Sequence, residues 1–192
     1  MGSNSSILLR PEEISQISQE TGFNQNQIKR LYGRFTSLDK DNKGYLSKQD
    51  FSRIPELHVN PLRDRIIEVL IDDHGQDEKL NFKQFARVFS TFRRGKAGVN
   101  DTNSKENKLR FLFNVYDRDK DDRINKNELL GILNMLVGAN LPEEQMNAIA
   151  ERTIAELLSE DEAGSNSITF KKFCDTLNKI DIEDKMSMKF LT

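Results

Sequence analysis

The chain of 192 residues is 36% hydrophobic and 31% charged, and its net charge of −2 leaves no basic field for nucleic acid. One cysteine, Cys174, excludes an internal disulfide framework, and no apolar run approaches the ~20 residues of a membrane span. These bounds predict a soluble cytoplasmic protein with no nucleic-acid partner.

Apolar residues recur at helical spacing along most of the chain. A helix is expected after Asn24, because Asn24 and Gln27 form a capping-box pattern. Asn60 followed by Pro61 predicts another helix start, since proline is tolerated at the first helical position. Further predicted helix faces are Leu109, Phe113 and Tyr116; Leu129, Leu130, Leu133 and Leu136; Met146, Ile149, Thr153 and Leu157; and Phe170, Phe173, Leu177 and Ile180.

Four polar loops of similar pattern follow apolar helices. They start at Asp39, Asp73, Asp117 and Asp161 and read DKDNKGYLSKQD, DHGQDEKLNFKQ, DRDKDDRINKNE and DEAGSNSITFKK. Each has an aliphatic eighth residue, which predicts a short antiparallel β-bridge between adjacent loops: Leu46, Leu80, Ile124 and Ile168. This repeat is typical of an all-α EF-hand protein, with two lobes each built from paired helix-loop-helix units.

Composition and the repeat together predict two lobes joined by a linker. The linker is assigned because it has hardly any apolar residues. The expected segments are an N-terminal arm and helix at 1–22, an N-lobe with loops one and two at 23–92, a linker at 93–107, a C-lobe with loops three and four at 108–183, and a tail at 184–192.

Loop three has the composition of a calcium site. Calcium takes six to eight oxygens, and an EF-hand loop supplies them from positions one, three, five, seven, nine and twelve. The predicted ligands are Asp117, Asp119, Asp121, the backbone carbonyl of Arg123, Asn125 and a bidentate Glu128. Asp122 stands at position six, where glycine is usual, but aspartate tolerates positive φ. The sequence therefore predicts one calcium ion, held by loop three.

The other three loops lack parts of this ligand set. In loop one, Lys43 puts an ammonium at position five and Asp50 is one methylene shorter than glutamate, so we expect weak Mg²⁺ binding or none. Loop two has Gly75 at position three and Gln84 at position twelve, and loop four has Lys172 at position twelve. Loops two and four are therefore predicted to be structural partners of their neighbours.

The chain starts with MGSNSS, which matches the pattern for N-myristoylation of Gly2. One myristoyl chain gives only marginal membrane affinity, on the order of 10⁴ M⁻¹. No polybasic cluster follows it, so stable residence on a membrane requires a membrane-bound partner. We predict a covalent myristate and a peripheral location at the inner face of membranes.

Several segments resemble the calcineurin B homologous proteins, the calcineurin-B-like EF-hand subunits of sodium/proton exchangers. They are MGSNSSILLRPEEI, GFNQNQIKRLYGRFTSLDK, RIPELHVNPLRDRII, NKLRFLFNVYDRDKDDRINKNELL and DKMSMKFLT. The resemblance implies a regulatory subunit that clamps an amphipathic juxtamembrane helix of an exchanger in an apolar groove and supports its activity and membrane delivery. Members of that family typically keep two working C-terminal loops, and this chain departs from them in loop four.

The sequence leaves one main alternative and argues against two other functions. The main alternative is a calcineurin-B-type regulatory subunit of a protein phosphatase, although four competent loops would be expected of such a subunit. A free calcium buffer would need several strong sites. An enzyme is not expected, because no nucleophile–base pair or phosphate-cradling glycine loop is present.

Overall fold

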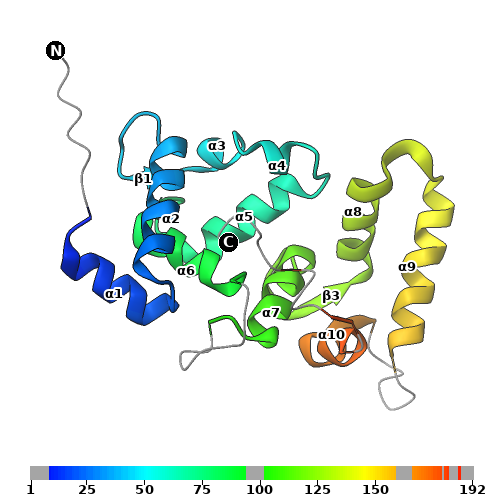
Figure 1. Ribbon diagram of the computed structural model, residues 1–192. Helices are drawn as coiled ribbons and strands as arrows, with labels where there is room; N and C mark the ends of the chain where they lie inside the picture. Colours follow the sequence, from blue (N-terminus) through cyan, green and yellow to red (C-terminus); the bar gives the residue numbers. More distant parts are fainter. Residues whose placement is uncertain (1–8, 94–101, 159–165, 179, 182–185, 187–192) are drawn as a thin grey trace.

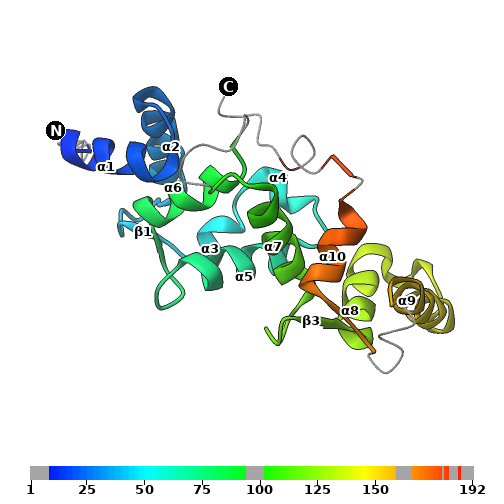
Figure 2. The same ribbon diagram turned by 90° about the horizontal axis from the view of Figure 1, so that it is seen from below.

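The computed structural model describes residues 9–93, 102–158, 166–178, 180–181 and 186. The first half contains α1 (Pro11–Thr21), α2 (Gln25–Leu38), β1 (Tyr45–Leu46), α3 (Lys48–Phe51), α4 (Pro55–His58), α5 (Arg63–His74), β2 (Leu80–Asn81) and α6 (Phe82–Thr91). The second half contains α7 (Lys105–Tyr116), β3 (Arg123–Asn125), α8 (Lys126–Val137), η1 (Gly138–Asn140), α9 (Glu143–Leu157), β4 (Ser167–Thr169) and α10 (Phe170–Leu177). Figures 1 and 2 show α1 and α9 at opposite ends of the molecule. None of the helices in the described residues has the length and apolar character to cross a membrane.

Each lobe joins its two loops through a pair of short antiparallel strands. Leu46 pairs with Leu80 in the N-lobe, and Ile124 pairs with Ile168 in the C-lobe. All four side chains are buried, because the strand pairing turns the eighth residue of each loop into the core. The predicted β-bridges and the all-α EF-hand fold are confirmed.

The start of α2 follows its sequence signal, whereas the start of α5 departs from it. The Asn24 side chain accepts the N–H of Gln27, and the Gln27 side chain accepts the N–H of Asn24, both at 3.0 Å, as the capping box predicts. By contrast, α5 begins at Arg63 and not at Pro61. Oδ1 of Asn60 accepts the N–H of Leu62 at 2.9 Å, so an Asx turn precedes the helix and delays its start.

The helix inside the predicted arm 1–22 is an integral part of the N-lobe. Ile17 of α1 is buried in the N-lobe core. Glu20 forms ion pairs with Lys83 at 2.8 Å and with Arg87 at 2.6 Å, and both partners lie on α6. These contacts hold α1 against α6, so α1 packs as a helix of the lobe that follows it.

The predicted linker 93–107 ends earlier in the structure, because α7 begins at Lys105. The Ser104 side chain accepts the N–H of Asn107 at 3.1 Å and caps the helix. The low apolar content of this stretch hid the helix start, since the first turn of α7 carries polar residues. Residues 94–101 lie outside the described part of the chain.

The two lobes are packed to different degrees. In the N-lobe, α6 buries six of its ten residues, and the rings of Phe35 and Phe85 meet edge to face with centroids 5.5 Å apart. In the C-lobe, α10 follows its loop in the same way but contains no buried residue. The C-lobe therefore leaves apolar surface that the described part of the chain does not cover.

The inward face of α9 differs from the predicted stripe of Met146, Ile149, Thr153 and Leu157. Ala150 and Ile154 are buried, whereas Ile149 is 41% exposed. Ala150 and Ile154 pack in one cluster with Ile124 and Ile168, the pair that joins the two loops. Leu157 packs against the same cluster, as the predicted stripe requires, so the inward face of α9 differs from the prediction only in part.

Candidate metal centre

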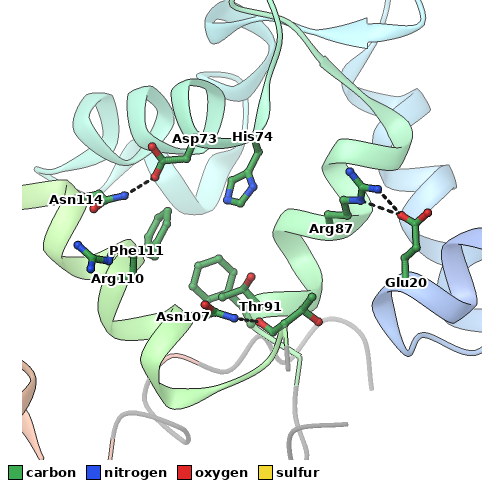
Figure 3. A pocket seen from close by; sticks show the side chains of 11 residues that line it. Glu20, Asp73, His74, Arg87, Thr91, Asn107, Arg110, Phe111 and Asn114 are labelled. Atoms are coloured by element: carbon green, nitrogen blue, oxygen red, sulfur yellow. Dashed lines mark hydrogen bonds and ion pairs between the residues drawn. The ribbon is translucent and has the colours of Figure 1, made fainter. Parts of the chain in front are cut away.

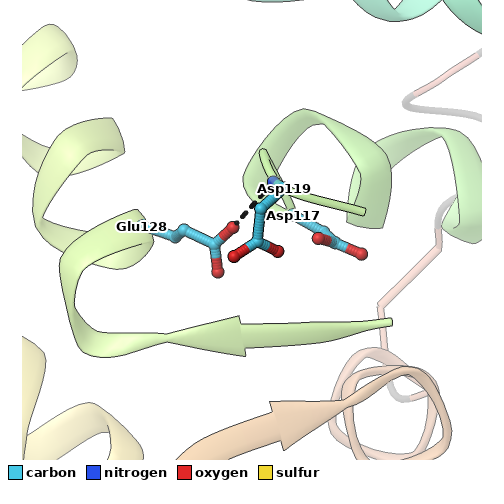
Figure 4. Close-up of side chains that lie close together, drawn as sticks. All are labelled: Asp117, Asp119 and Glu128. Carbon is cyan, nitrogen blue, oxygen red and sulfur yellow. Dashed lines mark hydrogen bonds between the residues drawn. The ribbon is translucent and has the colours of Figure 1, made fainter. Parts of the chain in front are cut away.

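Loop three brings three carboxylates together. Asp117, Asp119 and Glu128 each place a carboxylate oxygen within 4.8 Å of the others. Figure 4 shows Glu128 reaching from the start of α8 toward the two aspartates that follow α7. Among the described residues, no other group of three acidic, histidine or cysteine side chains converges in this way.

Backbone N–H groups of the loop hold these carboxylates in place. Asp117 is 3% exposed, and its two oxygens accept the N–H groups of Asp121 at 3.2 Å and Asp122 at 3.0 Å. Glu128 accepts the N–H of Asn125 through Oε2 at 3.0 Å. The loop backbone therefore pre-orients positions one and twelve toward a common centre.

The remaining predicted ligands lie in the loop but make other contacts. Oδ1 of Asp121 accepts the N–H of Arg123 at 2.8 Å. Arg123 lies in β3. Oδ1 of Asn125 accepts the N–H groups of Asn127 at 2.9 Å and Glu128 at 3.1 Å, and so caps α8. This cap suits position nine, which often reaches a calcium ion through water.

The electrostatics of the group fit a divalent cation. Burial raises the pKa of Asp117, and the nearby negative charge of Glu128 raises it further, although hydrogen bonds from the loop backbone oppose this. A bound cation would relieve that repulsion. Asp122 takes φ of +62° at position six, as the loop requires. Hard carboxylate oxygens in this arrangement suit Ca²⁺.

Loop one has the same backbone conformation as loop three. The two oxygens of Asp39 accept the N–H groups of Lys43 at 3.0 Å and Gly44 at 2.7 Å, as Asp117 does at the matching positions. Positions four and six have positive φ in both loops, at Asn42, Gly44, Lys120 and Asp122. The conformation of an ion-binding loop is therefore present in loop one.

A lysine occupies the cation position of loop one. Nζ of Lys43 lies 2.7 Å from Oδ2 of Asp50, the residue at position twelve, which is 1% exposed. Burial of Asp50 opposes its ionisation, but hydrogen bonds from Lys43 and Ser47 outweigh that and hold its pKa below the ordinary value. These residues do not fit a divalent cation, so the weak magnesium binding considered for loop one lacks support in this geometry. The sequence revealed the missing ligand, but not that Lys43 itself pairs with Asp50.

Loop two is a tight hairpin. Gln76 and Lys79 exchange backbone hydrogen bonds at 2.8 and 3.0 Å, and the two residues between them, Asp77 and Glu78, have φ of +52° and +57°. A Cβ on Gly75 would lie 2.5 Å from a backbone oxygen of α5, so glycine is required there. In this hairpin the backbone of loop two does not have the conformation of an ion-binding loop. This agrees with the prediction that loop two is a structural partner of loop one.

Two predicted features lie outside the described residues. Gly2, the predicted site of myristoylation, is one, and residues 161–165, which hold the first positions of loop four, are the other. Lys172, at position twelve of loop four, donates its backbone N–H to Oγ1 of Thr169 at 3.4 Å. The backbone of Lys172 thus helps to cap α10.

A cavity of about 700 Å³ lies between the lobes (Figure 3). Charged side chains on its wall are paired: Arg87 with Glu20 at 2.6 Å within the N-lobe, and Asp73 with Asn114 at 2.6 Å across the two lobes. Burial lowers the pKa of His74, which also faces the cavity. Because polar groups on its wall bind one another, we interpret this cavity as part of the contact between the two lobes and not as a ligand site.

Comparison with known proteins finds an EF-hand family model and B subunits of calcineurin among the relatives of this chain. Residues 106–177 match the family model described as an EF-hand domain pair. The chain is 43% identical over 189 residues to the B subunit of calcineurin from Naegleria gruberi, covering 98% of this chain and 99% of that protein. It is 38% and 35% identical to the type 2 and type 1 B subunits of calcineurin from Dictyostelium discoideum, over 95% and 97% of this chain and 94% and 98% of those proteins.

Proposed function

Because the chain belongs to the calcineurin B family, we propose that it is the regulatory subunit of a larger protein and binds an amphipathic helix of that protein. The chain is a calcium-binding EF-hand protein and not an enzyme. In the proposed function, calcium in loop three reinforces the complex with the helix.

The open apolar face of the C-lobe carries this proposal. Met135 and Leu136 of α8 are 41% and 46% exposed, and Ile149 of the neighbouring α9 is 41% exposed. Leu133 of α8 and Phe173 of α10 are also only partly buried. An amphipathic helix of a partner would cover these side chains with its own apolar face.

The apolar residues of the C-terminal tail at 184–192 are a second candidate cover for this face. Met186, the described residue of the tail, packs against the N-lobe core. Met188, Phe190 and Leu191 lie outside the described residues. The proposal therefore assigns the C-lobe face to a partner.

A phosphatase catalytic subunit is the first candidate partner. The relatives are named as B subunits of calcineurin, which favours the alternative over the exchanger that the sequence resemblance put first. The exchanger helix stays the second candidate for two reasons. Neither loop of the N-lobe is suited to an ion, because Lys43 occupies the cation position of loop one and loop two is a hairpin. The segment GFNQNQIKRLYGRFTSLDK also resembles the exchanger-associated family.

Titration of the calcium-loaded chain with two peptides distinguishes the two candidates. One peptide has the sequence of a phosphatase helix that binds a calcineurin B protein, and the other that of an exchanger juxtamembrane helix. We expect the phosphatase peptide to bind more tightly by at least about tenfold, or about 1.4 kcal/mol. The reverse order would establish the exchanger function, and binding of neither peptide would contradict helix capture altogether.

A charge on the open face tests where the helix binds. We expect Leu136→Glu to weaken peptide binding by at least about tenfold, because a carboxylate would be buried under the apolar helix. Val59→Glu is the matched control, since Val59 is 87% exposed on the other lobe. Calorimetry on both variants checks this, and equal losses would place the helix elsewhere.

The membrane proposal depends on acylation of Gly2. A chain expressed in a eukaryotic cell should carry an added mass of ~210 Da, the mass of a myristoyl group, and Gly2→Ala should remove it. Mass spectrometry of the intact chain measures both. A wild-type chain without the added mass would exclude the myristate and the peripheral location proposed from it.

A further inference from the structure

A buried arginine joins the two lobes beside loop three. Arg65 lies on α5 of the N-lobe and is 7% exposed. Its guanidinium donates to the backbone carbonyls of Asn114 at 2.8 Å, Val115 at 3.1 Å and Asp117 at 3.4 Å. These carbonyls end α7 in the C-lobe, where a helix leaves acceptors without partners and favours a positive charge. Asp117 is also the first predicted ligand of loop three.

Polar contacts tie the C-terminal end of α5 to the same region. Oδ2 of Asp73 accepts a hydrogen bond from Nδ2 of Asn114 at 2.6 Å, as Figure 3 shows. Nζ of Lys120, in loop three, lies 3.5 Å from Oδ1 of Asp73 and 3.6 Å from Oδ2 of Asp72. Asp73 is position one of loop two, so this carboxylate binds the opposite lobe where a working loop would bind an ion.

Apolar packing connects α5 to both helices that flank loop three. Val69 of α5, Val115 of α7 and Ile132 of α8 form one cluster, and each is at most 3% exposed. Close-packed side chains of this kind transmit small displacements. The N-lobe therefore contacts the end of α7 and the start of the calcium loop through polar and apolar groups together.

We propose that Arg65 is a positioning residue for the metal centre: it fixes the backbone at Asp117 and links calcium occupancy of loop three to the packing of the N-lobe. The proposal rests on loop three as the calcium site. Because such a link is reciprocal, Arg65 raises the calcium affinity of the loop, and calcium stabilises α5 through Arg65.

The direction in which calcium affinity changes when Arg65 is replaced distinguishes a positioning role from a simple effect of its charge. A cation near a calcium site repels the ion, so removing the charge of Arg65 would tighten calcium binding if charge dominated. Glu68 forms an ion pair with Arg65 and already compensates that charge. Positioning predicts the opposite result, weaker binding, and it requires the planar fork of arginine, which lysine lacks.

Calorimetric titration of the full chain with calcium tests the proposal on Arg65→Met, Arg65→Lys and Ile132→Val. We expect both Arg65 variants to weaken calcium binding by about tenfold, as other residues that orient metal ligands do. Ile132→Val disturbs the same interlobe contact without touching the α7 carbonyls, and should change the calcium Kd by less than about twofold. If Arg65→Met does not fold, Arg65→Lys alone tests the proposal, because lysine keeps the charge and the aliphatic stem.

Amide hydrogen exchange, with and without calcium, gives a second readout that a merely structural role would not change. In the wild type, calcium should slow exchange in α5, whereas in Arg65→Lys it should slow exchange in α8 only. Unchanged affinity in both Arg65 variants, tighter binding in Arg65→Met, or an equal loss in Ile132→Val would overturn the proposal. A wild-type chain that binds no calcium would instead refute the assignment of loop three.

Discussion

Glu128→Gln weakens calcium binding to loop three by on the order of 100-fold, or about 2.7 kcal/mol. Glu128 places one carboxylate oxygen within 4.8 Å of those of Asp117 and Asp119, and glutamine removes its charge and one of its two acceptor oxygens. The remaining amide oxygen can still accept the N–H of Asn125, which Glu128 accepts at 3.0 Å. The cap of α8 is therefore kept, but the contacts of Oε1 with the N–H groups of Arg118 at 2.7 Å and Asp119 at 3.3 Å are lost, because an amide NH2 group cannot accept them.

Calorimetry with calcium at physiological Mg²⁺ measures this loss. Glu156→Gln is the matched control, because it removes the same charge from an exposed position of the C-lobe, where Glu156 pairs with Arg152 at 2.7 Å. That control should keep the wild-type affinity and a stoichiometry of one ion. A Glu128→Gln chain that still binds one ion with wild-type affinity would show that the ion lies in another loop.

Local patterns in the sequence predicted the elements that local contacts determine. Asn24 and Gln27 cap each other three residues apart, and the pattern of two residues was enough to place the start of α2. The aliphatic eighth residues predicted the pairing of Leu46 with Leu80, because the EF-hand repeat fixes which loops are neighbours. The group of three carboxylates in loop three followed from the same spacing.

Features that depend on packing between distant segments were not predicted. Arg65 donates to carbonyls 49 to 52 residues away, and nothing in its own helix indicates those acceptors. Ile149 fits the predicted apolar stripe of α9, yet the cluster around Ile124 selects Ala150 and Ile154 as the buried pair. Spacing along one helix cannot choose between faces that differ by one residue.

Loops one and two show two different ways in which an EF-hand loop can do without an ion. Loop one keeps the loop backbone, and Lys43 supplies a positive charge beside Asp50. Loop two gives up the loop backbone for a hairpin, and Asp73 turns to Asn114 in the other lobe. In both cases, a contact within the chain replaces a contact with a metal ion. Loops one and two are therefore expected to keep their own conformations when calcium is removed.

Lys43→Asp combined with Asp50→Glu creates a second calcium site, with a Kd on the order of 10⁻⁴ M or tighter. Asp39 already accepts the backbone N–H groups of positions five and six, so the loop needs only a carboxylate at position five and a longer one at position twelve. Calorimetry should count two ions per chain where the wild type binds one. Without calcium the variant should melt at a lower temperature than the wild type, because its carboxylates repel one another, and calcium should reverse this.

Lys43→Met separates the loss of the lysine from the gain of ligands. This variant removes the internal cation but supplies no oxygen at position five, so it should still bind one ion per chain. It should also melt at a lower temperature, with or without calcium, because the buried carboxylate of Asp50 loses its 2.7 Å partner. A double variant that still binds one ion would mean that the buried side of loop one has no room for the longer carboxylate. A Lys43→Met chain that binds two ions would mean that the lysine alone excludes the metal, and that position five needs no ligand of its own.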